Sequence, residues 1–149
     1  MKILIDLDIV TNALWKGKEK EIAIRFLNKT KKEAELEIYT PYSLLQRVLN
    51  WKYRNLATKI FNFYSIYSDR ILSWKEIRKN LGGINYKAVI KLLEKIGVKR
   101  EDAVLVLIAS VFELRIETFN RKHLHNKQNE INEILKKFNL KEIEIHVPT

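Results

Sequence analysis

Short apolar runs alternate along the chain with segments whose apolar residues recur at helical spacing. The strand-like runs are Ile3–Ile5, Glu35–Tyr39, Arg115–Thr118 and Ile143–Val147. Strands separated by helices form βαβ units, in which parallel strands make a sheet that helices cover on both faces. The sequence has no internal repeat or obvious linker, so we expect residues 1–149 to form one three-layer α/β domain with a central parallel sheet of about four strands.

The segments between these runs carry the start and stop signals of helices. Pro41 suits the first turn of a helix, where its missing N–H is not needed. Ser73 begins a capping box, and Gly82-Gly83 ends the helix that follows it. Arg100–Leu114 is strongly apolar and is typical of a buried helix. A further helix is predicted over about 18–32, and the helix that begins at Pro41 ends near 49 or, in a longer alternative, continues to 63. Two more helices, over about 85–96 and 126–138, each begin at an asparagine cap.

Composition excludes several classes of protein and site. The chain has no cysteine, so a disulfide framework and a thiolate metal site are both excluded. Away from the three histidines near the C-terminus, a metal would be bound by oxygen, which Mg²⁺ and Mn²⁺ prefer. The longest apolar stretch, Ala103–Phe112, is too short to span a bilayer, and Asp6 follows too early for a signal peptide. We therefore expect a cytoplasmic protein without a membrane partner.

The net charge of +10 is concentrated in the middle of the chain. Residues 51–100 contain twelve Lys and Arg against three Asp and Glu, whereas the regions before and after them are nearly balanced. A localised basic excess suggests a polyanionic partner, although a lysine-rich solvated helical surface would have the same composition. The cations expected to be exposed in this region are Lys52, Arg54, Lys59, Arg78 and Lys79.

Aromatic residues are interspersed with these cations. Aromatic rings can stack on unpaired bases while cations contact the phosphates. Aromatics at helical spacing are, however, more often part of a core or a dimer interface, so we expect most of them to be buried. The eight residues concerned are Trp51, Tyr53, Phe61, Phe63, Tyr64, Tyr67, Trp74 and Tyr86.

Polar side chains stand where several predicted strands end. Asp6 and Asp8 follow the first strand, Asn120 follows the strand at residues 115–118, and Asp102 begins the most apolar helix. Ligands bind beyond the carboxyl ends of parallel strands, and carboxylates gathered there repel one another unless a cation lies between them. Each residue also has a local explanation: Asp6 or Asp8 as a helix cap, Asp102 as a first-turn acid, and Asn120 as a turn residue.

Four motifs occur in a characteristic order along the chain. They are an apolar strand ending in Asp-x-Asp (Ile3–Asp8), a Pro-initiated helix (Thr40–Val48), an apolar helix starting with Asp-Ala (Asp102–Ala109), and a strand ending in Thr-x-Asn (Ile116–Leu124). In this order the motifs resemble those of PIN domains, a family of metal-dependent ribonucleases that includes the toxins of toxin–antitoxin pairs. The resemblance covers nearly the whole chain and is weakest over residues 51–100.

The resemblance implies a PIN-like fold and an acidic pocket that binds Mg²⁺ or Mn²⁺ and hydrolyses RNA phosphodiesters. Asp6 and Asp102 would bind the metal, and Asp8 and Asn120 would hold metal-bound waters or complete its coordination. Gln46 stands where the family has an inward glutamate, so the site would carry one negative charge fewer. The resemblance further implies an antitoxin partner and a homodimer.

Cations near the pocket are candidates for contact with RNA phosphates. They are Lys52, Arg54, Arg78, Lys79, Arg121, Lys122 and His123. Arg121, Lys122 and His123 could equally be solvated side chains without a ligand. A zinc site at His123 and His125 is disfavoured because no cysteine accompanies them. Two further functions stay open: an RNA-binding module on a catalytically degenerate PIN scaffold, and a subunit whose middle helices dock on a partner protein.

Overall fold

Five parallel strands form the central sheet of the computed structural model, which describes residues 1–149. The strands are β1 (Lys2–Ile5), β2 (Glu37–Pro41), β3 (Arg70–Leu72), β4 (Arg115–Glu117) and β5 (Ile145–His146). They are ordered β3-β2-β1-β4-β5, so β1 is central. Ile3 is in register with Ile38 of β2, and Leu4 is in register with Ile116 of β4. All strands are parallel, so their carboxyl ends lie at one edge of the sheet.

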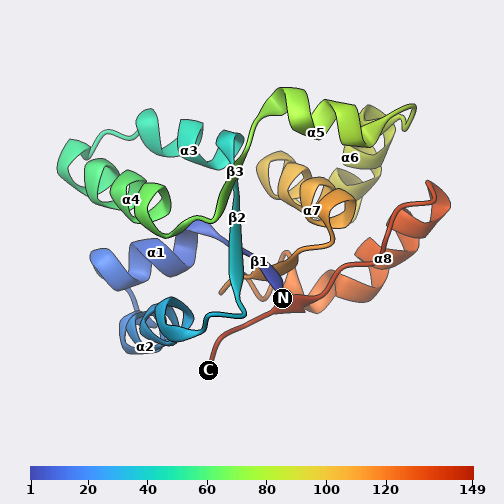
Figure 1. Cartoon of the computed structure of the whole chain (residues 1–149). Coiled ribbons are helices and arrows are strands. Elements are labelled where there is room, and N and C mark those ends of the chain that lie inside the picture. The colour runs from blue at the N-terminus through green and yellow to red at the C-terminus, as the bar shows by residue number, and fades with distance from the viewer.

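Eight α-helices cover the two faces of the sheet, four on each side (Figure 1). One layer contains α1 (Leu7–Leu14), α2 (Lys20–Lys32), α3 (Tyr42–Leu49) and α4 (Arg54–Tyr67). The other contains α5 (Trp74–Leu81), α6 (Tyr86–Lys95), α7 (Arg100–Phe112) and α8 (Gln128–Lys137). Within the layers, α1 packs on α2 and α4, while α7 packs on α5 and α6. The expected three-layer α/β architecture is confirmed.

The core lies on both sides of β1 and extends around α7. Ile3, Leu4 and Ile5 are fully buried, as expected for a strand covered on both faces. Helix α7 is buried on nearly all sides, which explains why its sequence lacks a polar stripe. The predicted caps of α5 and α6 are confirmed: the Ser73 Oγ accepts from the Glu76 N–H at 3.2 Å, and the Asn85 Oδ1 accepts from the Ala88 N–H at 3.2 Å.

The structure differs from the sequence-based prediction at four places along the chain. Strand β3 is a three-residue edge strand with only one buried side chain, so it has almost no apolar pattern. Helix α1 is a separate element that Asp6 caps. The longer alternative of one helix through residues 41–63 is wrong, because residues 50–53 separate α3 from α4. Asn126 does not cap α8, since it lies inside a short 3₁₀ turn, His125–Lys127, that precedes the helix.

None of the helices combines the length and the apolar character that crossing a bilayer requires.

Candidate active site at the carboxyl end of the sheet

Asp6 lies at the junction between the central strand and α1. Its Oδ1 accepts a hydrogen bond from the Leu7 N–H at 2.8 Å, so its local role as a helix cap is confirmed. Its Oδ2 accepts from the Thr118 hydroxyl at 2.8 Å, across 112 residues of sequence. The Asp6 N–H donates to the Glu117 carbonyl at 2.9 Å, in continuation of the β1–β4 pairing. The cap therefore holds a buried carboxylate over the end of the sheet.

Asp8 occupies the first turn of α1 and faces the same loop after β4. The Thr118 hydroxyl lies 3.3 Å from its Oδ2, and the Phe119 N–H donates to its two oxygens at 3.2 and 3.3 Å. Thr118 has a single hydroxyl proton, which Asp6 and Asp8 therefore share. The two aspartates and Thr118 form one hydrogen-bonded cluster.

Asp102 and Asn120 complete this edge of the pocket. Asp102 is buried in the first turn of α7, and its Oδ2 accepts from the Asn120 Nδ2 at 3.3 Å. The Asn120 Oδ1 accepts from the His123 N–H at 3.1 Å, and its own N–H donates to the Thr118 Oγ1 at 3.0 Å. The structure thus brings together Asp6, Asp8, Asp102 and Asn120, four of the residues that the sequence singled out.

Burial and mutual repulsion shift the titration of these carboxyl groups. Burial is the main cause that raises the pKa of Asp6, opposed by its hydrogen bond from Thr118. Burial, followed by the charge of Asp6, raises the pKa of Asp8 to about 7 and that of Asp102 to about 6. The Tyr64 phenol below them is fully buried and donates to the Ile5 carbonyl at 2.8 Å; burial, Asp6 and Asp8 raise its pKa. Added positive charge would stabilise the ionised pocket.

Arg47 of α3 supplies positive charge to the pocket. Its guanidinium lowers the pKa of both Asp6 and Asp102, and its Nη2 lies 3.2 Å from the Glu101 Oε2. The Arg47 Nη1 is buried and has no hydrogen-bond partner. Every other buried side-chain nitrogen or oxygen has one. An unpaired buried donor is costly, so a water or a ligand oxygen at this nitrogen would be favourable.

Gln46 was expected to point into the pocket, but it does not. Its side chain is exposed, and its Oε1 accepts from the Trp74 Nε1 of α5 at 3.4 Å. The signal for this orientation was in the sequence. Leu44, Leu45 and Val48 define the buried face of α3, and the 3.6-residue period puts position 46 on the opposite face and position 47 at the border. The residue of α3 whose charge acts on the two buried aspartates is therefore Arg47.

The arrangement limits how a divalent cation can be held. No three Asp, Glu or His side chains are grouped so that they could bind one ion together. Asp8 is engaged by the loop after β4, and the Asn120 oxygen is engaged by His123. Mg²⁺ is, however, often bound by one or two carboxylates, waters and a substrate phosphate. Asp6 and Asp102 also accept hydrogen bonds, but both are buried and the charge of Asp6 acts on Asp102, so this pair could supply the two carboxylates.

The predicted RNA-contacting cations are divided between two sides of the molecule. Lys52 and Arg54 are exposed at the junction of α3 and α4, whereas Arg78 and Lys79 are exposed on α5 in the other helical layer (Figure 1). Arg121 forms a two-pronged ion pair with Glu19, with distances of 2.9 and 3.0 Å. Lys122 is exposed and His123 is half-buried in the same turn.

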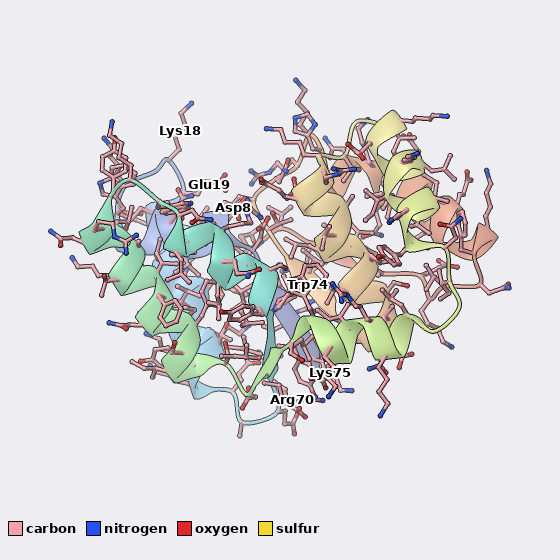
Figure 2. All side chains as sticks on the ribbon, turned by 90° about the horizontal axis from the view of Figure 1, so that it is seen from above. Asp8, Lys18, Glu19, Arg70, Trp74 and Lys75 are labelled. Carbon is pink, nitrogen blue, oxygen red and sulfur yellow. The ribbon has the colours of Figure 1, made fainter.

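Figure 2 looks onto the carboxyl edge of the sheet, and Asp8 and Glu19 both lie on the α1 side of this edge. Lys18 extends outward beyond them, while Trp74 and Lys75 lie toward the other helical layer. Because Arg121 pairs with Glu19, its charge is neutralised near the acidic cluster.

Most of the eight aromatics are not buried, contrary to expectation. Only Phe63 and Tyr64 are buried, and Tyr53, Tyr67 and Tyr86 are exposed. The remaining three are partly buried against the core: Trp51, Phe61 and Trp74. Helical spacing alone did not distinguish the exposed rings, which lie at helix ends: Tyr53 precedes α4, Tyr67 is its last residue and Tyr86 is the first residue of α6.

Comparison with known proteins identifies the fold. No family model matches the chain, and a search of curated proteins found no match. The structure is similar to VapBC2 from Rickettsia felis bound to a DNA fragment from its promoter, with a TM-score of 0.62 and 13% identity over 100% of both chains. It is also similar to FitAB bound to the IR36 DNA fragment, with a TM-score of 0.59 and 13% identity over 99% of this chain and 95% of the other.

FitAcB from Neisseria gonorrhoeae is a third similar structure, with a TM-score of 0.52 and 14% identity over 83% of this chain and 90% of the other. The chain has a PIN-domain fold. At these identities the similarity shows the fold alone.

The raised pKa values predict how stability depends on pH in metal-free solution. A carboxyl group whose pKa is higher in the folded state stabilises that state at low pH, and this contribution is lost as pH rises through the folded pKa. For Asp102 the window runs from its usual value of 3.8 to about 6. Asp102→Asn cannot ionise, so its melting temperature relative to the parent should rise between about pH 4 and 7. A constant difference across that range in chelator-treated thermal melts would contradict the prediction.

A second prediction separates Arg47 from its neighbour on α3. Arg47→Met keeps the aliphatic stem and removes the charge that lowers the pKa of Asp6 and Asp102, so the pKa of Asp102 should rise further. Gln46→Ala is the matched control, because that side chain is neutral and exposed. Carboxyl-carbon NMR titrations of both variants measure the effect. Equal shifts in the two variants, or none in Arg47→Met, would show that Arg47 does not act on the pocket.

Proposed function

We propose that the chain is a PIN-type endoribonuclease that hydrolyses RNA phosphodiesters with Mg²⁺ or Mn²⁺ at Asp6 and Asp102. The observation that carries the proposal is the convergence of these buried carboxyl groups at the carboxyl edge of the sheet, where burial raises the pKa of both and the charge of Asp6 raises that of Asp102 further. Carboxyl groups whose pKa is raised by burial and by a nearby charge concentrate at functional sites. The PIN-domain fold supports a nuclease-type activity.

The residues of the chain have separate tasks in this proposal. When bound, the divalent ion lowers the pKa of a coordinated water and neutralises charge on the attacked phosphate. The Leu7 N–H and the Thr118 hydroxyl fix the Asp6 carboxylate, and the Asn120 amide fixes that of Asp102. Arg47 reduces the repulsion between the two acids before substrate arrives, and its unpaired Nη1 can donate to a phosphoryl oxygen once that atom becomes accessible.

A second candidate is an RNA-binding module that has lost catalysis. The outward orientation of Gln46 and the cation at Arg47 favour it, because the pocket lacks the family's glutamate and already contains a positive charge.

The resemblance to toxin-type PIN domains also supports an antitoxin partner and a homodimer. The similar structures include VapBC2 and FitAB bound to DNA fragments, and a comparable protein partner for this chain is part of the proposal.

Replacing Asp102 tests the catalytic proposal. Asp102→Asn keeps the size of the side chain and removes one of the two proposed metal-binding carboxylates, so RNA cleavage in Mn²⁺ should fall by roughly 100-fold or more. The rise in melting temperature on adding Mn²⁺ should also disappear, because stabilisation by a ligand follows its affinity. Glu130→Gln is the matched control, since Glu130 is an exposed first-turn acid of α8. A parent protein that binds RNA but neither cuts it nor responds to Mn²⁺ would favour the binding module.

The divided basic surface makes a further prediction about RNA affinity. Two double variants test it, and each removes two exposed charges from one helical layer. The first replaces Lys52 and Arg54, and the second replaces Arg78 and Lys79 in the opposite layer. The double variant on the binding face should bind all sequences more weakly and have a salt dependence shallower by about 1.4, or 0.7 for each lost phosphate contact. The other double variant serves as its control. Unchanged affinity in both, measured by titration at several salt concentrations, would locate the binding face elsewhere.

A further inference from the structure

Trp15 and Tyr53 form an exposed pair of aromatic rings away from the acidic cluster. Trp15 follows the last residue of α1, and Tyr53 immediately precedes α4. Their ring centroids are 5.4 Å apart and the rings are tilted by 47°. Trp15 is 40% exposed and Tyr53 is 56% exposed, and Leu14 beside them is also exposed. Exposed apolar side chains gathered in one patch are typical of a binding site.

A pocket of about 450 Å³ opens next to these rings, between the end of α1 and the start of α4. Its lining consists of Leu14, Trp15, Tyr53, Arg54, Asn55, Leu56 and Lys59. Apolar surface and two cations thus meet in one concave site without a carboxylate. The helices on either side pack against each other, so the pocket has firm walls.

Cations surround the aromatic pair. The Lys16 Nζ is 5.0 Å from the centroid of the Trp15 ring, and the Lys52 Nζ is 6.0 Å from that of Tyr53. Neither lysine forms an ion pair with an acidic side chain, and the same is true of Arg54 and Lys59. These charges therefore remain available to an anionic ligand.

Around Lys52, Arg54 and Lys59 the sequence contains no acid to balance these cations. From Ile38 to Ser68 the chain has no aspartate or glutamate, although this stretch includes the whole of α3 and α4. A surface for an apolar protein partner would not require such a bias. Exposed rings flanked by unpaired cations are instead the arrangement that binds single-stranded nucleic acid, because bases stack on the rings and phosphates contact the cations.

We propose that Trp15 and Tyr53 form a stacking site for unpaired bases of an RNA strand, whose phosphates contact Lys16, Lys52 and Lys59. At 5.4 Å the rings are too close to hold a base between them, so bases stack on their outer faces. Helix α1 runs from Asp8 to this site, about 10 Å along its axis at 1.5 Å per residue. Roughly three nucleotides span that distance at the 3.4 Å rise of a stacked strand. The choice of RNA rests on the proposed function; the stacking site does not.

Binding measured without divalent ions tests the site separately from catalysis. The probes are a short fluorescein-labelled single-stranded oligouridine and the same strand annealed into a duplex, both in chelator. Trp15→Ala and Tyr53→Ala should each weaken single-strand binding by about 5- to 150-fold, the range for one lost base–aromatic stack. Duplex affinity should change much less, because paired bases cannot stack on the rings. The salt dependence should stay unchanged in these two variants and become shallower in a variant that combines Lys16→Ala and Lys52→Ala.

Three controls make the outcome decisive. Trp15→Phe and Tyr53→Phe keep an aromatic face and should retain most of the affinity, and the retained duplex affinity of the two alanine variants checks that they are folded. Tyr86→Ala removes an exposed ring from the other helical layer and should have no effect. Unchanged single-strand binding in both alanine variants would overturn the proposal. So would tighter binding of an acidic, tryptophan-containing peptide that depends on the same two rings. If Asp102→Asn leaves cleavage unchanged while these variants lose binding, the proposed catalysis fails and the stacking site stands.

Discussion

A carboxylate buried at the end of the central strand has to be neutralised or hydrogen-bonded, and the carboxyl edge of this protein is organised around that requirement at Asp6. Burying an ionised carboxylate without partners is very costly. Here one partner is local, the N–H of the adjacent Leu7 in α1, and the other is distant, the hydroxyl of Thr118 after β4. Tyr64 of α4 binds the carbonyl of the preceding residue, Ile5. The same contacts that satisfy Asp6 therefore hold strand ends and helices together.

The sequence predicted the parts of this arrangement that depend on local patterns. The apolar runs of β1 and β4, the caps at Ser73 and Asn85, and the buried α7 follow from periodicity and capping chemistry over a few residues. Strand β3 could not be found in this way. It is short and mostly exposed, and it is held by pairing with β2 and by the Asp69 carboxylate, which accepts from the Ile38 N–H at 2.7 Å. That contact joins residues 31 apart and has no local pattern.

At the candidate site, the sequence-based prediction was wrong about Gln46 for a different reason. The family motif assigned the inward position of α3 to Gln46, whereas the helical period defined by Leu44, Leu45 and Val48 excluded it. Periodicity reflects which face packs on the core, and it was the stronger constraint. Thr118 and Arg47 were inside the quoted motifs, but no spacing rule marks a hydroxyl that two carboxylates share or a guanidinium that acts on two acids from another helix.

Charge is distributed with opposite sign inside the pocket and around it. The pocket gathers aspartates whose pKa is raised, while the chain carries a net charge of +10 and α3 and α4 contain no acid. A basic exterior attracts a polyanion over a distance of several ångströms, but it does not neutralise a buried carboxylate.

Inside the pocket, Arg47, protons or a divalent ion can neutralise the carboxylates, and these three compete for the same negative charge. Under the proposed function, a substrate phosphate would shift that competition, because it would add ligands for the ion and an acceptor for the unpaired Arg47 Nη1. Helix α1 joins both regions, since Asp6 caps its first turn and Trp15 follows its last, so a strand held at the aromatic pair would be oriented relative to the acids by one short helix.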